Sequence, residues 1–266
     1  MSHPEIRRPA VAGMFYPARP EELRAMIGNW LTEAKAGGPV PKAVIAPHAG
    51  YVYSGPIAAS AYAHLLPARA RIRRVVLAGP SHRMAFRGVA LSGAQAFTTP
   101  LGDVPVDPHA AAELRALPQV RVLDSAHALE HSLEVQVPFL QVVLDSFSLV
   151  PLAVGDAEPA EIAEVYEQLW DGPETLIVVS SDLSHYHSYK EARRLDEAAS
   201  RAIEQLRPDD LDPEQACGRL PIAGLLLAAK QHGLKARTID LRSSGDTAGP
   251  RDEVVGYGAY LFTEPE

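Results

Sequence analysis

Histidine side chains follow three strand-like runs of the sequence, at the points where those runs end. They are His48 after residues 42–47, His82 after residues 73–80, and His185 after residues 175–182, the last of which is Asp182. In an open α/β sheet, ligands bind in the crevice outside the carboxyl ends of the strands. Because imidazole is a common metal ligand and titrates near neutral pH, this pattern indicates a metal site or an acid–base site.

A fourth segment with the residue types of a site is EHSLEVQVPFL, residues 130–140. His131 and Glu134 are three residues apart, so they share one face of the helix expected over 130–144. Such a pair suits a metal ligand or a residue that supports one. Glu130 has a second explanation, because acidic side chains in a first helical turn complement the helix dipole.

Cys217 is the single cysteine of the chain and precedes a helix expected over 221–233. The positive end of that helix dipole, together with Arg219, is expected to lower the pKa of the thiol toward the thiolate form. The alternative is a buried cysteine that packs as a small apolar residue. One cysteine excludes an intramolecular disulfide and a multi-cysteine zinc cluster.

The elements that position these residues alternate between strand-like and helix-like segments. The short, β-branched runs lie at 42–47, 73–80, 88–93, 147–155, 175–182, 235–240 and 256–263. Apolar residues recur at helical spacing over 55–66, 107–117, 130–144, 158–170, 189–206 and 221–233. This alternation predicts an α/β fold with a mostly parallel or mixed central sheet and helices on both faces. No long linker interrupts the pattern, so we expect one domain over residues 1–266.

Composition excludes several classes of partner. The chain has 266 residues, 47% of them hydrophobic, and a net charge of −8, with its lysines and arginines scattered along the sequence. Nothing in that pattern suggests binding to nucleic acid or to an anionic membrane. No stretch reaches the ~18 apolar residues of a membrane span, and no signal-like apolar region follows the N-terminus. We therefore expect a cytoplasmic protein.

Six motifs, in the same order along almost the whole chain, resemble the Memo family. They are RRPAVAGMFYP (7–17), PHAGYVYSGPIAASAY (47–62), GPSH (79–82), EHSLEVQVPFLQ (130–141), SSDLSHY (180–186) and CGRLPI (217–222). Bacterial and archaeal members of that family are called protein B of the AmmeMemoRadiSam system. The resemblance implies a fold similar to the class III extradiol dioxygenases, with a metal-binding cleft.

The resemblance also implies roles for individual residues. A ligand set of two histidines and one cysteine would be His48, His82 and Cys217. His185 would occupy the place of the acid–base histidine, with Asp182 beside it. Around them we place His131, Glu134 and Tyr51 as supporting residues. We expect iron(II) or copper in this ligand set. Zinc is a third choice, because the affinity of the ligands alone does not select among the three metals.

Two functions from different classes follow. The first is a redox or oxygenase-type enzyme that uses the metal and His185 on a small substrate, in a pocket lined by Tyr51, Tyr53 and Tyr186. The second is a module that binds a peptide or small ligand in the same cleft without catalysis. A zinc hydrolase fits less well, because the histidines are not on an H-E-x-x-H helix. The system name implies a radical-SAM protein and an Ammecr-type protein as partners.

Overall fold

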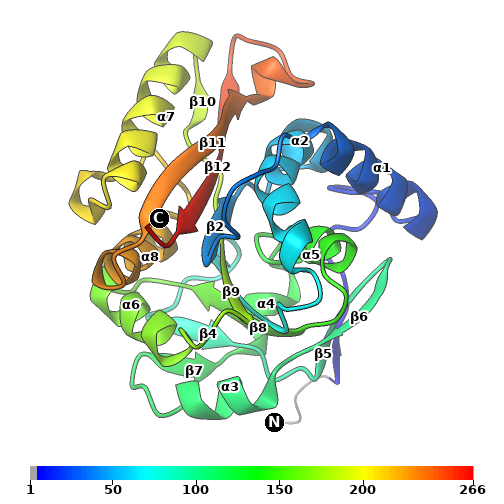
Figure 1. Ribbon diagram of the computed structural model, residues 1–266, viewed down its shortest axis with the longest axis vertical. Coiled ribbons are helices and arrows are strands. Elements are labelled where there is room, and N and C mark those ends of the chain that lie inside the picture. The colour runs from blue at the N-terminus through cyan, green and yellow to red at the C-terminus, as the bar shows by residue number, and fades with distance from the viewer. Residues whose placement is uncertain (1–4, 266) are drawn as a thin grey trace.

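A mixed sheet of nine strands runs through the centre of the computed structural model, which describes residues 5–265 (Figure 1). The strand order is β10-β12-β2-β9-β3-β8-β4-β7, and β11 pairs with β12. The strands are β2 (Ala43–Ala46), β3 (Arg74–Pro80), β4 (Val89–Leu91), β7 (Val120–Val122), β8 (Ser148–Val154), β9 (Thr175–Ser180), β10 (His185–His187), β11 (Lys235–Ser243) and β12 (Val254–Thr263). The predicted α/β fold with a mixed sheet is confirmed.

The middle of this sheet is parallel. Strands β2, β9, β3 and β8 all run in one direction, whereas β12 pairs antiparallel with β2, and β4 pairs antiparallel with β8. Parallel strands in a row bring their carboxyl ends to one edge of the sheet. The loops that follow Ala46, Pro80 and Ser180 therefore begin side by side.

Helices cover both faces of the sheet, and this explains why its central strands are apolar except near their ends. On one face lie α1 (Pro20–Glu33), α2 (Tyr51–Tyr62) and α5 (Val137–Val143), and on the other α3 (Pro108–Leu114), α6 (Pro159–Gln168), α7 (Tyr189–Glu204) and α8 (Arg219–Gln231) (Figure 1). Alternate residues of β2 enter different cores: Val44 packs with the first set of helices and Ile45 with the second. Each face thus has its own hydrophobic core.

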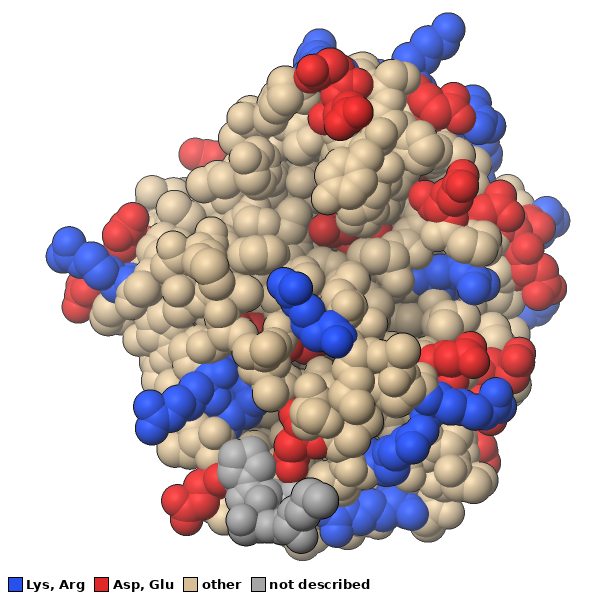
Figure 2. Space-filling view, turned by 180° about the vertical axis from the view of Figure 1, so that it is seen from behind, with Lys and Arg blue, Asp and Glu red and all other residues tan. Residues whose placement is uncertain are grey.

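Shorter elements complete the described chain. A three-stranded sheet is formed by β1 (Ile6–Arg7), β5 (Ala96–Thr99) and β6 (Gly102–Pro105). The remaining helical turns are α4 (Asp124–Ala128), η1 (Ala63–Ala68), η2 (Glu134–Gln136), η3 (Pro208–Asp210) and η4 (Ser244–Asp246). Among residues 5–265, no helix combines the length and the apolar character needed to cross a bilayer. Basic and acidic side chains are interspersed on the face that Figure 2 shows.

The helix predicted over 130–144 is wrong at its beginning. The α-helix starts only at Val137, and the 3₁₀ turn η2 precedes it. Pro138 in the first turn lacks the N–H that a continuing helix would need, and such a position favours a helix start. His131 and Glu134 therefore do not share a helix face. This change of local structure decides where the two side chains point.

The packing of the sheet generates a stability prediction at Gly88. This residue precedes β4 with φ +89°, and a Cβ added there would lie 2.2 Å from the carbonyl oxygen of Gln119. Gly88→Ala should lower the free energy of unfolding by at least about 2 kcal/mol. Gly28→Ala is the control, because a Cβ added at that position in α1 would meet no atom within 4 Å beyond the neighbouring backbone of its own helix. That substitution should stabilise the fold by ~0.5–1 kcal/mol. Urea denaturation of both variants checks this, and equal stabilities would contradict it.

Candidate metal centre

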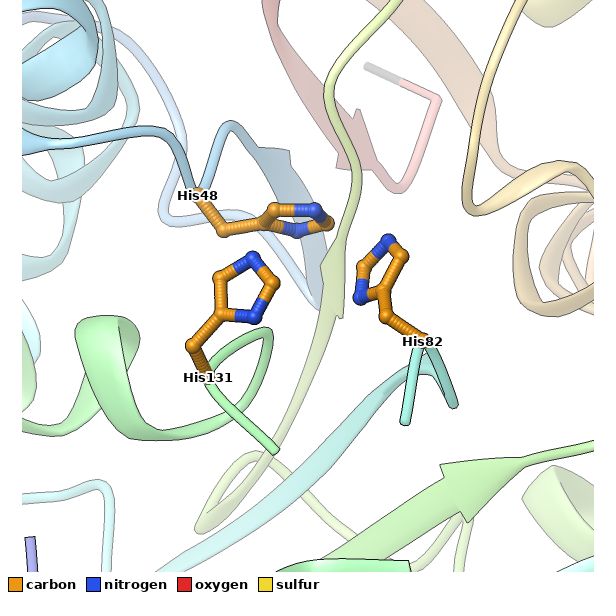
Figure 3. Close-up of side chains that lie close together, drawn as sticks. All are labelled: His48, His82 and His131. Atoms are coloured by element: carbon orange, nitrogen blue, oxygen red, sulfur yellow. The ribbon is translucent and has the colours of Figure 1, made fainter. Parts of the chain in front are cut away.

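Three imidazoles converge at the carboxyl edge of the parallel strands (Figure 3). His48 follows β2, His82 follows β3, and His131 lies in the loop before η2. One ring nitrogen from each lies within 4.8 Å of the others, a grouping that could hold one metal ion. The ring centroids of His82 and His131 are 4.8 Å apart. The ring centroid of His48 lies 5.2 Å from that of His82 and 5.5 Å from that of His131. Sequence reasoning placed His131 only among the supporting residues.

The hydrogen bonds of His48 determine which of its nitrogens carries the proton. Its Nδ1 lies 2.9 Å from Oγ of Ser180. The Ser180 hydroxyl donates its only proton to the carbonyl oxygen of Ser132, at 2.6 Å, so Nδ1 of His48 must be the donor to Ser180. Nε2 of His48 is then unprotonated and has the lone pair that a metal ion requires.

Gln136 reinforces this arrangement. Its Nε2 donates to Oγ of Ser180 at 2.8 Å, and its Oε1 accepts from the hydroxyl of Tyr62 at 2.8 Å. The tyrosine proton fixes which end of the amide is oxygen, so the amide nitrogen must face Ser180. Ser180 therefore accepts two hydrogen bonds and donates one, and its capacity is filled.

His82 has a charged partner instead. Its Nδ1 lies 3.0 Å from Oε1 of Glu130, and its backbone N–H donates to Oε2 at 2.5 Å. Burial opposes ionisation of Glu130, but hydrogen bonds from His82 and from the backbone of Ser132 hold its pKa well below the usual range. The ionised carboxylate can only accept, so Nδ1 of His82 donates to it and Nε2 of His82 is left for a ligand.

His131 packs against Phe15, with ring centroids 4.9 Å apart. Its Nδ1 has no hydrogen-bond partner among the described residues, although Oε1 of Glu130 is 3.4 Å away. Burial lowers the pKa of His131 to about 4, and burial beside the other two rings lowers the pKa of His48 well below its usual value. Both rings are uncharged at neutral pH, which is the form that binds metals. The unpartnered, buried Nδ1 of His131 is an atom that a bound metal ion would satisfy.

Cys217 lies beside this cluster. Its Sγ is 3.3 Å from Nε2 of His48, on the lone-pair side of that ring. Burial raises the pKa of the thiol to about 12, and the nearby Asp182 adds to the shift. The expectation that the helix N-terminus lowers this pKa is therefore wrong for the metal-free chain, because desolvation outweighs the dipole. Coordination by Cys217 stays a prediction.

Asp182 and His185 line an open cavity of about 390 Å³. His131 also lines it, and the other walls are Phe15, Ala49, Gly50, Tyr53, Tyr186, Ser244, Gly249, Pro250, Val255 and Tyr257. Burial raises the pKa of Asp182 to about 7, although its carboxylate accepts the backbone N–H groups of His48 and Ala49. Burial lowers the pKa of His185. The cavity thus has a histidine of the cluster on one wall and two titratable groups on others.

Two residues expected near the metal have other contacts. The Tyr51 hydroxyl donates to the carbonyl oxygen of Val135 at 2.6 Å, and its ring is buried in the core beside Phe139. The Glu134 carboxylate forms a buried ion pair with Arg7. It also accepts from the hydroxyl of Tyr16 and from the backbone N–H groups of Ala10 and Val11. The Glu134 contacts hold the N-terminal segment in place. The polar atoms of Tyr51 and Glu134 are thus engaged by groups other than the three imidazoles.

The residues that support the cluster directly or through Ser180 include three that the sequence did not single out or left open. Glu130 fitted both a helix start and a site, whereas Ser180 and Gln136 were not singled out from the sequence. A signal did exist for Ser180, since a polar residue ends the otherwise apolar run 175–179. Only the structure shows that this hydroxyl faces His48.

Comparison with known proteins gives one family over most of the chain. The family model described as "Memo-like protein" matches residues 7–261. A "MEMO1 family protein" of Ignicoccus hospitalis is 38% identical over 98% of this chain and 99% of its own length. Similar proteins of Archaeoglobus fulgidus and Aquifex aeolicus are 37% and 34% identical, each over 97% of this chain and 99% of their own length. The resemblance carried by the six motifs is confirmed.

The raised pKa of Cys217 predicts slow alkylation of the metal-free protein. Since the folded thiol stays protonated up to a pKa of about 12, iodoacetamide should react with it at pH 7.5 at least ~10-fold more slowly than with a free cysteine of pKa about 8.5. The rate should continue to rise between about pH 8 and pH 10, because the thiolate fraction is still growing there. The urea-unfolded chain is the control. A rate that levels off near pH 8 would contradict the assignment.

Proposed function

The chain belongs to the family of Memo-like proteins, and from this premise we propose that it is a metal-dependent redox enzyme of oxygenase type. One metal ion would be held by His48, His82 and His131, with Cys217 as a further ligand. The observation that carries this proposal is the convergence of three imidazoles, two of which have Nδ1 committed to hydrogen bonds.

Iron(II) or copper is the proposed metal. Imidazole suits iron, copper and zinc, and a thiolate adds preference for softer ions. When bound, such an ion would supply one-electron chemistry and polarise a coordinated oxygen atom. Zinc remains the alternative, because a zinc ion held by histidine and cysteine is chemically ordinary.

Asp182 and His185 are proposed to move protons at the cavity wall. A group whose pKa is about 7 populates both protonation states at neutral pH, as a general acid or base must, and Asp182 meets that requirement. His185 lines the same cavity with an uncharged ring. Tyr53 and Tyr257 offer aromatic faces to a small substrate held between these groups.

A binding module is the second candidate, and exposed apolar side chains beside the cavity favour it. Tyr186, which lines the cavity, is 74% exposed. Met14 and Val52, which precede the lining residues Phe15 and Tyr53 in sequence, are 73% and 56% exposed. Exposed apolar patches often mark sites of interaction with other molecules. The ligand in this case would be a peptide or small molecule, and the radical-SAM and Ammecr-type proteins are the partners we propose to test.

Metal binding is tested first, on purified chain stripped of metal. Anaerobic titration with Fe(II) or Zn²⁺ should give one ion per chain. His48→Ala, His82→Ala and His131→Ala should each weaken the affinity by more than ~100-fold, because loss of a ligand should cost more than the 10–100-fold typical of an outer-shell partner. His109→Ala is the matched control, since that histidine is exposed on α3. Binding that survives all three substitutions would rule out the site.

Oxygen consumption separates the enzyme from the binding module. The Fe(II)-loaded protein should take up oxygen only when a suitable member of a panel of catechols and peptides is added. His185→Ala should abolish at least ~90% of that uptake at unchanged metal content, because a general acid or base contributes 10²–10⁴-fold. A ligand that binds without uptake would favour the binding module and overturn the enzyme.

A further inference from the structure

Glu130 connects two of the segments that carry the imidazoles. Oε2 accepts the backbone N–H of His82 at 2.5 Å, and Oε1 accepts Nδ1 of His82 at 3.0 Å. Oε1 also accepts the backbone N–H groups of His131 and Ser132, both at 2.9 Å. The side chain is 1% exposed. Four N–H groups of the loops after β3 and before η2 thus meet on one buried carboxylate.

We propose that Glu130 is a positioning residue for the metal centre, acting through His82 and His131. It fixes the Nδ1–H tautomer of His82, so that Nε2 of that ring is available, and it sets the separation of the two histidine backbones. The inference rests on the proposed metal function. It concerns a residue that touches neither the metal nor the substrate.

The chemistry of the four donors requires a carboxylate at this position. An ionised carboxylate has two oxygens and only accepts, whereas a carboxamide replaces one oxygen with a donor. In Glu130→Gln, the amide nitrogen would face either the backbone N–H of His82 or the cluster of donors at Oε1. One donor would lose its acceptor in the first orientation and three in the second, at a cost of about 1–3 kcal/mol for each.

The backbone of Ser132 extends this network to His48. Its N–H donates to Glu130 at 2.9 Å and its carbonyl oxygen accepts from Ser180 at 2.6 Å. Ser180 in turn accepts from Nδ1 of His48. An anionic partner therefore supports His82, a neutral hydroxyl supports His48, and the backbone of one residue, Ser132, joins the two. A carboxylate behind a ligating histidine also raises the basicity of that ligand.

Glu134 provides a matched control within the same segment. It is also 1% exposed and also accepts from several donors. Those donors belong to Arg7, Ala10, Val11 and Tyr16, none of which is a candidate ligand. Glu134→Gln should therefore affect folding stability, whereas Glu130→Gln should affect the metal centre as well.

The test compares Co²⁺ binding by the two variants. Competition against a chelator should show Glu130→Gln weakened by 10–100-fold and Glu134→Gln within about 3-fold of the unmodified chain. The visible absorption bands of bound Co²⁺ should change in Glu130→Gln only. Urea denaturation reports any stability loss separately. Equal Co²⁺ affinities and spectra in the two variants would overturn the positioning role.

A second measurement needs neither a variant nor a metal. Long-range ¹H–¹⁵N NMR of the metal-free chain reports which nitrogen of each imidazole is protonated. Nδ1 of His82 should carry a proton, and an Nδ1 without a proton would overturn the inference. If the unmodified chain binds no Co²⁺, the proposed metal function fails, but the tautomer result still decides what Glu130 does.

Discussion

Three imidazoles lie within reach of one another, and the rest of the site depends on keeping His48 and His131 uncharged among them. Burial removes the water that would solvate an imidazolium, and each ring opposes a positive charge on its neighbours. The pKa values of His48 and His131 fall for these reasons. A neutral imidazole has one donor and one acceptor, so the orientation of each ring depends on the partner of its protonated nitrogen.

Those partners come from the ends of strands and from one loop. Ser180 is the last residue of β9, and Glu130 lies in the loop that also contains His131. The parallel order of β2, β9 and β3 places the ends of these strands next to one another. The buried ion pair between Arg7 and Glu134 then anchors the N-terminal segment, whose Phe15 covers His131. Strand order thus brings the three histidine-bearing loops together, and the ion pair fixes the N-terminal segment outside them.

The sequence predicts the parts of the site that follow from strand ends. His48 and His82 come directly after apolar runs, and apolar runs of that length are buried strands whose ends meet. His131 was less predictable, because its direction depends on Pro138 delaying the helix start. The sign of the pKa shift at Cys217 was wrong, since the sequence shows the helix dipole but does not show the depth of burial. The short strands β1, β5, β6, β7 and β10 were missed, because two to four residues carry too little periodicity.

The central claim is that three imidazole nitrogens hold one metal ion, and X-ray absorption spectroscopy of the Zn²⁺-loaded chain tests it most directly. We expect at least three imidazole nitrogens at about 2.0–2.1 Å from the Zn²⁺ ion, and a sulfur at about 2.3 Å if Cys217 also binds. Removing His131 by substitution with alanine should reduce the number of imidazole nitrogens by one. A shell of oxygen atoms alone, or one with fewer than three imidazoles in the unmodified chain, would contradict the claim.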